Sequence, residues 1–372
     1  MVDGGVPVIY TLMHLAFLTG SPWDRLHECV RRYRDPYAMH EIRKRSGGNR
    51  RICVPAPYLK RVQTWIHRSI LLSDGARALV HDSSTAYGPG CSSHKNATVH
   101  AGASWIVKLD IKDFFESISE RQVYHLYRKL GYPALLAFEL ARLSTRHISP
   151  YREGARLFRD GRWRWTAGQP GKAWPYPRVD QVGHLPQGAP TSPMLANLVV
   201  REMDEKIKII ARAAGATYTR YADDMVLSLT FGSRAAATAL LQSVADVVTG
   251  EGFRINRKKT HACGPGARKI VTGLLVNETS PRLPRSLKDE IELALHFIER
   301  RGLMAHLEHK KSNNPIGYLN HLKGLILYAQ LIEPDFASAA KDELARVLHP
   351  YTEFLDVFKT FRPAETNKFK FG

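Results

Sequence analysis

The chain has 372 residues, of which 44% are hydrophobic and 24% are charged. This composition excludes an intrinsically disordered chain, and the length suffices for one large core or for two to three packed subdomains. Lys and Arg number 54 against 35 Asp and Glu, so the formal net charge is +19. Because the basic residues are spread along the chain, they favour a long groove for a polyanion such as nucleic acid, although secreted basic proteins and anionic-membrane binders share such a charge.

Neither a disulfide framework nor a membrane anchor is expected. The chain contains four cysteines, at Cys29, Cys53, Cys91 and Cys263. They are far apart and fit no zinc spacing, which predicts reduced thiols in a cytoplasmic protein with no membrane partner. The apolar stretch Val8–Leu18 is too short to span a bilayer and lacks the features of a secretory signal, so it is predicted to be an amphipathic helix packed on the body.

Hydrophobic periodicity predicts helices and a strand in the first half of the chain. Tyr58–Leu72 places four apolar residues on one helical face, namely Leu59, Val62, Ile66 and Ile70. Ser104–Leu109 is a short apolar strand that ends at Asp110. Ser119 is expected to cap a helix that runs to about Leu130.

The second half predicts alternating helices and strands, which indicates an α+β plan with a sheet covered by helices on one face. In chain order these elements are a helix from Ser192 to about Ala214 with a Glu202–Lys206 pair, strands Thr217–Tyr221 and Met225–Thr230 joined by a tight hairpin, a helix over about Arg234–Thr249, and short strands at Phe253–Asn256 and Lys269–Asn277. After a linker at Thr279–Pro284, Ser286 and Asp289 predict a capping box for the next helix. The remaining chain predicts a small helical subdomain.

The segment from Ser144 to Gln181 differs in composition from the rest. It combines many arginines with five tryptophans or tyrosines, namely Tyr151, Trp163, Trp165, Trp174 and Tyr176. Aromatic rings among arginines suit base stacking and phosphate contact. An irregular finger that packs its own aromatic rings fits the composition equally well.

Three aspartates have the placement that phosphodiester chemistry needs. Asp110 follows an apolar strand, and Asp223 and Asp224 lie in the turn of the predicted hairpin. Two Mg²⁺ ions can activate a hydroxyl and stabilise a pentavalent phosphate, and Mg²⁺ prefers a few carboxylates from separate elements. The alternative for the Asp pair alone is an ordinary solvated turn.

The surrounding motifs favour the metal site. Residues 107–115 read VKLDIKDFF, residues 185–193 read LPQGAPTSP, and residues 221–224 read YADD, in that order. Together they resemble the successive palm motifs of reverse transcriptases, over a stretch from about Arg50 to Asn277. The resemblance assigns catalysis and the binding of two Mg²⁺ ions to Asp110, Asp223 and Asp224.

The same resemblance implies an α+β right-hand polymerase fold with fingers, palm and thumb. The N-terminal helices and fingers would occupy residues 1–105. The palm, an antiparallel sheet backed by helices, would occupy 106–278 with a fingers insertion at about 144–182. A small helical thumb and the C-terminal region would occupy 285–372.

A site for deoxynucleoside triphosphates is implied as well. Phe115 matches the bulky residue under the incoming sugar, where a ring leaves no room for a ribose 2′-hydroxyl, and an ordinary core Phe is the alternative. Ile111 and Asp113 of the same motif are expected to line this site. Gln187 and Gly188 match the turn that lies against the nucleotide and the template.

Basic residues are expected around the triphosphate. Residues 256–260 read NRKKT and resemble the next motif, in which a lysine faces the triphosphate. Lys259 is the expected residue, with Lys258 as the alternative. Arg51 and Lys60 match fingers positions that clamp the triphosphate, and a solvated basic face is the alternative for both.

Two further segments narrow the family. Residues 96–100 read NATVH and resemble the Asn-Ala-x-x-His signature of retron reverse transcriptases, and residues 271–273 match their Val-Thr-Gly signature. RNA binding is therefore expected of Asn96, His100, Val271, Thr272 and Gly273. The alternatives are a turn cap for Asn96 and a satisfied core histidine for His100.

A retron enzyme implies particular partners. It copies part of its own structured non-coding RNA, starting from the 2′-hydroxyl of a guanosine in that RNA, and yields multicopy single-stranded DNA branched from the RNA. The implied partners are this cognate RNA, its DNA product, deoxynucleoside triphosphates and a separate effector protein in antiphage defence. The alternatives are a reverse transcriptase of the abortive-infection or diversity-generating type, and a catalytically silent RNA-binding scaffold, against which the three intact aspartates argue.

Overall fold

A computed structural model describes residues 5–33, 35–43, 49–147 and 182–351 of the chain. The described residues form helices and antiparallel sheets, which confirms the predicted α+β class. They divide into two compact units, one from the described parts of Met1–Asn96 and Ala103–Ala267, the other from Ala97–Gly102 and the described part of Arg268–Gly372. The five tryptophans and tyrosines of the arginine-rich segment lie outside the described residues. None of the described helices is long and apolar enough to cross a membrane.

Helices and a β-hairpin begin the first unit. They are α1 (Leu12–Thr19), α2 (Trp23–Arg31), the antiparallel strands β1 (Tyr37–Arg43) and β2 (Asn49–Pro55), α3 (Pro57–Trp65), a π-helical continuation of α3 (Ile66–Leu71), and α4 (Asp74–Arg77). The four apolar residues predicted on one face of the 58–72 helix are all buried, which confirms that helix. The helix predicted from Val8 begins later, because the Thr11 hydroxyl accepts the His14 amide (3.1 Å) and caps it there.

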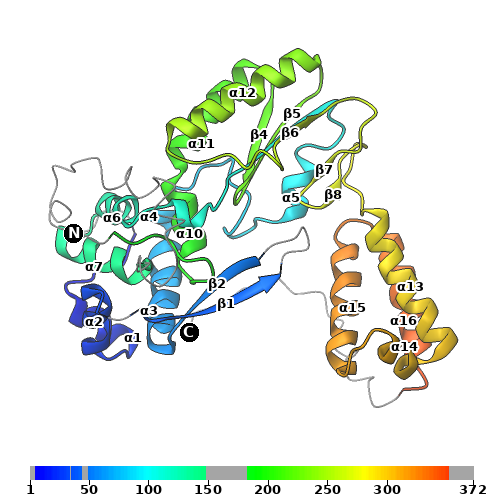
Figure 1. The fold of residues 1–372 in the computed structure, drawn as a ribbon, viewed down its shortest axis with the longest axis horizontal. Helices are drawn as coiled ribbons and strands as arrows, with labels where there is room; N and C mark the ends of the chain where they lie inside the picture. Colours follow the sequence, from blue (N-terminus) through cyan, green and yellow to red (C-terminus); the bar gives the residue numbers. More distant parts are fainter. Residues whose placement is uncertain (1–4, 34, 44–48, 148–181, 352–372) are drawn as a thin grey trace. The chain divides into compact units, whose positions relative to one another are not determined.

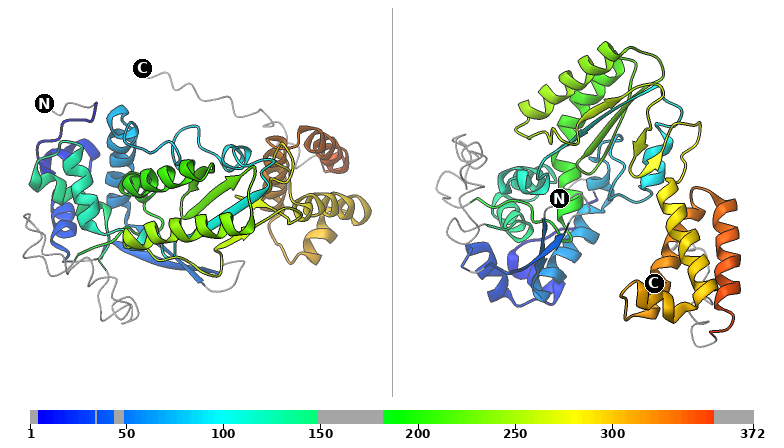
Figure 2. Two further views of the ribbon diagram at one scale, coloured as in Figure 1. Left: turned by 90° about the horizontal axis from the view of Figure 1, so that it is seen from above. Right: turned by 45° about the vertical axis from the view of Figure 1, so that its right-hand side comes forward.

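A four-stranded antiparallel sheet forms the centre of the first unit (Figures 1 and 2). Its strands lie in the order β4 (Thr217–Tyr221), β5 (Asp224–Leu229), β3 (Trp105–Asp110) and β6 (His261–Cys263). α11 (Arg201–Ala213) packs on β4, and α12 (Arg234–Gly250) packs on β3 and β6. The strand predicted at 104–109 and the hairpin predicted at 217–230 are confirmed, while the sequence does not predict β6.

Shorter elements complete this unit. They are α5 (Ser93–Thr98), a 3₁₀ turn (Phe115–Ser117), α6 (Glu120–Lys129), α7 (Ala134–Ser144) and α10 (Ser192–Val199). α6 begins as predicted, with Ser119 and Gln122 in a reciprocal capping box. One hydrophobic core extends from the N-terminal helices through α6 and α7 to α12. The four cysteines are free thiols, as predicted.

The long helix predicted from Ser192 is interrupted. Val200 leaves helical geometry (φ −88°, ψ 9°), which separates α10 from α11. Within α11, Lys206 forms an ion pair with Glu251 instead of the predicted Glu202. The prediction is wrong because Glu251 is distant in sequence and comes close only through the packing of α12 on α11.

Two predicted strands differ from the structure. Residues 253–256 form only an isolated antiparallel bridge, between Ile255 and Ile111. The strand predicted at Lys269–Asn277 is instead a short hairpin, β7 (Ile270–Val271) and β8 (Leu274–Leu275). The chain reverses there because two successive residues, Thr272 (φ 45°) and Gly273 (φ 87°), adopt positive φ.

The second unit contains this hairpin and a group of helices. In the described residues these helices are α13 (Arg285–Arg301), α14 (Leu303–His309), α15 (Pro315–Gln330) and α16 (Pro334–Leu348). α13, α15 and α16 pack on one another, which confirms the helical C-terminal prediction up to residue 351. The predicted capping box is wrong: Pro284 precedes α13 without a side-chain cap, and Asp289 pairs with Arg285 (2.7 Å between Oδ1 and Nε).

A buried carboxylate ties α6 to its neighbours. Glu120 has no exposed surface and accepts hydrogen bonds from Arg32 Nη2 (2.7 Å), Arg142 Nε (3.1 Å) and the Gly183 amide (2.8 Å). Burial alone would raise the pKa of Glu120. The two arginine charges and these hydrogen bonds together outweigh burial and hold the pKa below its usual range.

Glu120→Gln is expected to lower the free energy of unfolding at pH 7 by roughly 3 kcal/mol, because two buried arginines lose their anion. Since the folded-state pKa is depressed, this stability is present above the unfolded-state pKa of about 4.3 and is lost as the pH falls through the folded-state pKa. Urea unfolding of both proteins should therefore give a large difference at neutral pH and a small one in strong acid. An equal difference at both would contradict the ionised buried carboxylate.

Candidate active site

Three carboxylates meet at one end of the central sheet. Asp110 is the last residue of β3, and Asp223 and Asp224 lie where β4 turns into β5. Asp224 is paired directly with Asp110 in the sheet register. The Ile111 amide donates to the Asp223 carbonyl (3.0 Å), which fixes the turn against the end of β3. The structure thus brings together the three aspartates that the sequence predicts as a group.

Asp110 is held by the segment that follows α12. Asp110 is almost completely buried, and it accepts hydrogen bonds from Asn256 Nδ2 at Oδ1 (2.8 Å) and from Lys259 Nζ at Oδ2 (2.7 Å). The Asn256 amide also donates to the Asp110 carbonyl (2.8 Å). Lys259, which the motif predicts to face a triphosphate, is here the counter-ion of Asp110. Asn256 joins the site although the sequence signals it only by its place in the 256–260 motif.

The crowding of these groups changes their proton affinities. Burial, followed by the negative charges of Asp224 and Asp110, raises the pKa of Asp223 to about 6. Burial also raises the pKa of Asp224, against the opposing charge of Lys108. Partial burial would lower the pKa of Lys259, but the contact with Asp110 outweighs it and the pKa is raised. An additional cation is therefore favoured at this end of the sheet.

This set of donors fits a divalent cation. Carboxylate oxygens are the hard ligands that Mg²⁺ prefers, and a cation among them relieves their mutual repulsion. Among the residues that the structure describes, no three acidic, histidine or cysteine side chains form a closed metal cluster as they stand. Asp110 is engaged by Lys259 instead, and the Lys259 side chain, which is 54% exposed, has room to withdraw.

Three aromatic rings, those of Tyr87, Phe114 and Phe115, lie next to one another. Phe115 is half-buried, and its ring centroid lies 5.6 Å from that of Phe114 and 6.3 Å from that of Tyr87. Burial, followed by the charge of Asp223, raises the pKa of Tyr87 to about 12. Phe115 is thus partly accessible, as a surface for a sugar must be. Tyr87 is a neighbour that the sequence does not single out, and its only signal is the Gly-Pro-Gly turn that follows it.

The two other predicted residues of this motif differ in exposure. Ile111 is buried, so only its backbone is available to a ligand. Asp113 is exposed and has a left-handed backbone (φ 50°), and its carbonyl accepts the amide of Ser117 (2.9 Å), the last residue of the 3₁₀ turn. Asp113 therefore shapes the turn that presents Phe115.

The 187–188 turn packs closely on β2. The Cys53 amide donates to the Gln187 carbonyl (2.7 Å). Gly188 has φ 110°, and a Cβ on it would lie 2.8 Å from Ile52 Cγ2 and 3.0 Å from the Cys53 carbonyl oxygen. Only glycine satisfies both the backbone conformation and this close approach.

The predicted fingers residues are both exposed. Arg51, on β2, lies 3.8 Å from Glu41 across the hairpin (Nε to Oε1), and Lys60 lies on α3. Their exposure suits a triphosphate clamp and a solvated basic face equally. A separate cavity of about 870 Å³ beside Asn256 has four other basic residues in its lining, Lys112, Arg254, Arg257 and Lys258.

Asn96 and His100 have no exposed surface. Asn96 Oδ1 accepts hydrogen bonds from Thr85 Oγ1 (2.9 Å) and Thr219 Oγ1 (2.6 Å), which ties its helix to β4. Burial lowers the pKa of His100 to about 4, so its ring is neutral at pH 7. Since neither side chain reaches the surface, an effect of either residue on RNA has to act through the backbone that it supports.

The second signature forms the β7–β8 turn. Val271 is buried, Thr272 is half-buried and Gly273 is exposed. No atom lies within 4 Å of a Cβ built on Gly273, so this glycine serves the turn and not a close approach within the protein. Thr272 and Gly273 are therefore the members of this signature that a ligand can reach.

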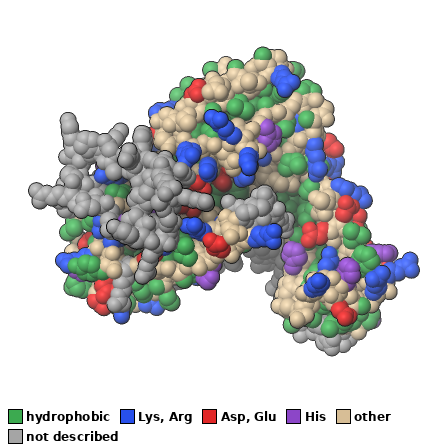
Figure 3. All heavy atoms as spheres, viewed as in Figure 1, with side chains coloured by type: hydrophobic (Ala, Val, Ile, Leu, Met, Phe, Trp, Pro, Cys, Tyr) green, Lys and Arg blue, Asp and Glu red, His purple; other side chains and the backbone are tan. Residues whose placement is uncertain are grey.

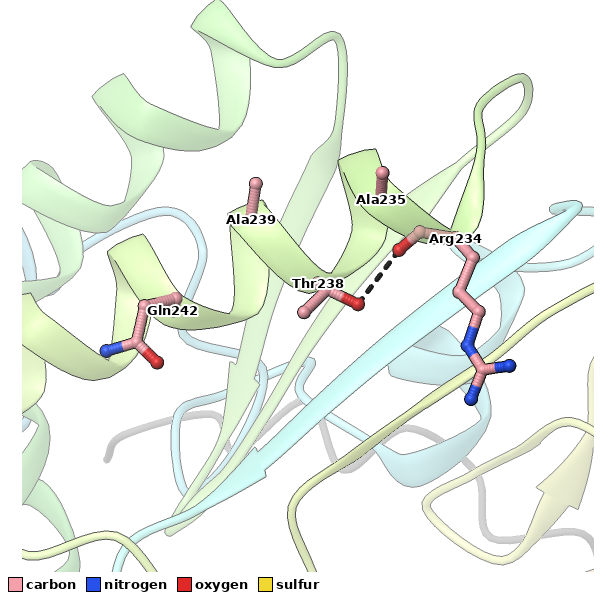
Figure 4. A pocket seen from close by; sticks show the side chains of 5 residues that line it. All are labelled: Arg234, Ala235, Thr238, Ala239 and Gln242. Atoms are coloured by element: carbon pink, nitrogen blue, oxygen red, sulfur yellow. Dashed lines mark hydrogen bonds between the residues drawn. The ribbon is translucent and has the colours of Figure 1, made fainter.

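A hollow elsewhere on the first unit lacks comparable chemistry (Figure 4). It has a volume of about 680 Å³ and lies along α12, lined by Arg234, Ala235, Thr238, Ala239 and Gln242. The Thr238 hydroxyl donates to the Arg234 carbonyl within the helix (2.9 Å), and Arg234 is the one charged residue of this lining. By contrast, Figure 3 shows Lys and Arg side chains gathered below α12 around acidic side chains.

The chain is similar to several known proteins. Residues 42–280 match the family described as reverse transcriptase (RNA-dependent DNA polymerase). Retron Mx162 reverse transcriptase of Myxococcus xanthus is 33% identical over 80% of this chain and 58% of its own length. Retron Mx65 reverse transcriptase of the same organism is 33% identical over 93% of this chain and 73% of its own length. A solved telomerase from Candida albicans, in complex with a fragment of telomeric RNA, is similar with a TM-score of 0.41 and 12% identity, over 89% of this chain and 67% of that chain.

Gly188→Ala should lower the thermal unfolding midpoint by several degrees, because the added Cβ needs both a positive φ and a displacement of β2. Gly215→Ala is the matched control, since Gly215 has φ 66° but no atom within 4 Å of a built Cβ. Calorimetry should therefore show a clearly larger loss for Gly188→Ala. Equal losses in the two variants would contradict the close packing of the turn on β2.

Proposed function

Because the chain belongs to the reverse transcriptase family, and within it to the retron reverse transcriptases, we propose that it makes branched multicopy single-stranded DNA on a cognate RNA. That RNA serves as template and, through the 2′-hydroxyl of a guanosine, as primer. The meeting of Asp110, Asp223 and Asp224 at one end of the central sheet is the observation that carries this proposal.

The right-hand plan divides the chain by function. We assign N-terminal helices and fingers to residues 1–105, a palm to 106–278 with its insertion at about 144–182, and a thumb to 285–372. Two features support this division. The four-stranded sheet with the three aspartates falls within the palm range apart from Trp105, the first residue of β3, and helices α13 to α16 fall within the thumb range.

Catalysis at this site rests on position and charge. The carboxylates of Asp110, Asp223 and Asp224 are proposed to bind two Mg²⁺ ions, which when bound supply activation of the primer hydroxyl and stabilisation of the pentavalent phosphate. Without a bound metal ion, Lys259 neutralises the charge of Asp110. The Lys259 side chain is half-exposed, so its ammonium group can contact a triphosphate once it has left the Asp110 carboxylate. Arg51 and Lys60 would bind the same triphosphate from the fingers.

The incoming deoxynucleotide is proposed to lie against Phe115, with the 187–188 turn on its other side. Partial exposure of Phe115 and its contacts with Phe114 and Tyr87 support a rigid ring at this place. A fixed ring excludes a ribose 2′-hydroxyl by volume alone, which favours deoxynucleotides.

The retron signatures are proposed to govern use of the cognate RNA. Thr272 and Gly273 would contact RNA at the β7–β8 turn, beside the buried Val271. Asn96 and His100 would support the backbone around residues 96–100 from inside the protein, since both side chains are buried. We further propose a cytoplasmic role in antiphage defence together with a separate effector protein.

Small nucleic acids from cells that express the chain test the proposed product. One discrete DNA that remains covalently joined to RNA is expected. The absence of any covalent RNA–DNA product, or a heterogeneous set of linear complementary DNAs, would contradict a retron function and favour another type of reverse transcriptase.

Asp223→Asn should abolish DNA synthesis and leave RNA affinity nearly intact, because the amide keeps the shape of the side chain and removes its charge. Primer extension in Mg²⁺ and filter binding measure the two properties, and a rate loss above about a hundredfold is expected. Asp342→Asn, on an exposed position of α16, is the control and should keep the parental rate. If the rate of DNA synthesis by Asp223→Asn stays within about tenfold of the parental rate, Asp223 is not a metal ligand.

Phe115→Ala should raise incorporation of ribonucleotides, because it opens the space that a 2′-hydroxyl would fill. The measured quantity is the ratio of kcat/KM for deoxy- and ribonucleotides, expected to fall by about tenfold or more. Phe231→Ala, at a highly exposed position, is the control and should leave this ratio unchanged. An unchanged ratio in Phe115→Ala would make Phe115 an ordinary core residue.

Replacing Asn96 and His100 together by Ala should suppress self-primed synthesis on the cognate RNA, while extension of an annealed DNA primer on a generic RNA survives much better. The reason is that the supported backbone, and not the catalytic aspartates, is expected to receive the RNA. Thermal melting of the double variant is the control for stability. Equal loss of both activities in a well-folded variant would instead place these residues in the catalytic step.

A further inference from the structure

Arg220 is the largest side chain that is fully buried in the described part of the chain. It lies on β4, three residues before Asp223. Its guanidinium donates from Nε and Nη2 to the two carboxylate oxygens of Asp204 (2.8 and 2.7 Å), and from Nη1 to Asn197 Oδ1 (3.1 Å) and the Ala222 carbonyl (3.0 Å). One side chain therefore links α10 and α11 to the turn that carries the aspartates.

The contact with Ala222 reaches a strained residue. Ala222 has φ 60°, in the left-handed region that alanine rarely adopts. Its carbonyl is held by Arg220, while the next carbonyl, that of Asp223, accepts the Ile111 amide (3.0 Å). These two bonds fix the peptide groups on both sides of Asp223, so they set the direction in which its carboxylate leaves the turn.

An ion pair is a costly way to fill this buried space. Taking both charges from water costs free energy that an apolar pair of similar volume avoids. Asp204 is nevertheless fully engaged, since it also accepts the Tyr218 hydroxyl (2.7 Å). What a bidentate arginine–carboxylate pair adds is a fixed plane, and here that plane directs Nη1 at the Ala222 carbonyl.

We propose that Arg220, oriented by Asp204 and Asn197, is a positioning residue that holds Ala222 in its left-handed conformation and thereby aims Asp223. This role rests on the proposed function of Asp223 in metal binding, but Arg220 itself touches neither metal nor substrate. Asn197 and Asp204 lie on the two helices that meet at Val200, so Arg220 bonds to both sides of this break.

Steady-state primer extension at saturating Mg²⁺ compares Arg220→Lys with the double variant Arg220→Lys/Ala222→Gly. Lysine keeps a charge for Asp204 but lacks the fork that also reaches Ala222, so kcat should fall by about thirtyfold or more while the KM for the deoxynucleotide stays nearly unchanged. Glycine adopts a left-handed φ without strain, so the kcat of the double variant should be at least about tenfold higher than that of Arg220→Lys. Leu140→Ala, in the buried core of α7, controls for lost stability and should keep kcat at temperatures where both variants are folded.

A kcat for Arg220→Lys that equals that of Leu140→Ala, or a loss that Ala222→Gly does not relieve, would overturn the proposed role. If Arg220→Lys does not fold, Asn197→Ala removes only one partner of the guanidinium and should lower kcat by about threefold or more. An unchanged kcat in that folded variant would overturn the role equally.

Asp223→Asn separates this role from the proposed function. An active Asp223→Asn variant refutes the metal site itself. An inactive Asp223→Asn variant beside an unaffected Arg220→Lys variant refutes only the positioning role of Arg220.

Discussion

Three carboxylates crowd one end of the central sheet, with Asp110 buried and Asp223 and Asp224 half-buried, and this crowding constrains the elements around them. Like charges at close range repel, and burial together with this repulsion raises the pKa of Asp223 and of Asp224. Hydrogen-bond donors from neighbouring segments stabilise these groups. Lys259 and Asn256 donate to the Asp110 carboxylate, and the Ile111 amide donates to the Asp223 carbonyl. A rigid acidic site of this kind is prepared for a cation before the cation arrives.

Buried ion pairs support this site from two directions. Asp204 and Arg220 join α11 to the turn that carries Asp223, and Glu120 joins α2, α6 and α7 to the segment that leads into the 187–188 turn. Exposed basic residues do not take part in these buried pairs, and the net charge of +19 that they produce is complementary to the phosphates of nucleic acids. Buried charge in this chain therefore fixes geometry, while binding of RNA through surface charge belongs to the proposed function.

Much of the core and the aspartate set could be predicted because their signals are local. An apolar run before Asp110 and a two-strand pattern around Asp223 need no knowledge of distant residues. Other features depend on contacts between remote segments. Strand β1 is mostly exposed and has no alternating pattern, Lys206 finds Glu251 only through helix packing, and the burial of Asn96 needs the hydroxyls of Thr85 and Thr219. The bond from Arg220 to a strained alanine carries no sequence signal at all.

Local cleavage of the chain by bound Fe²⁺ shows whether Asp110 and Asp223 share one metal site. Fe²⁺ is used in place of Mg²⁺, and with ascorbate and peroxide it generates hydroxyl radicals that cut the backbone beside the ion. We expect fragments that end near Asp110 and near Asp223, which excess Mg²⁺ suppresses and which Asp223→Asn does not give. Cleavage confined to other parts of the chain, or unchanged in Asp223→Asn, would contradict a metal site formed by these aspartates.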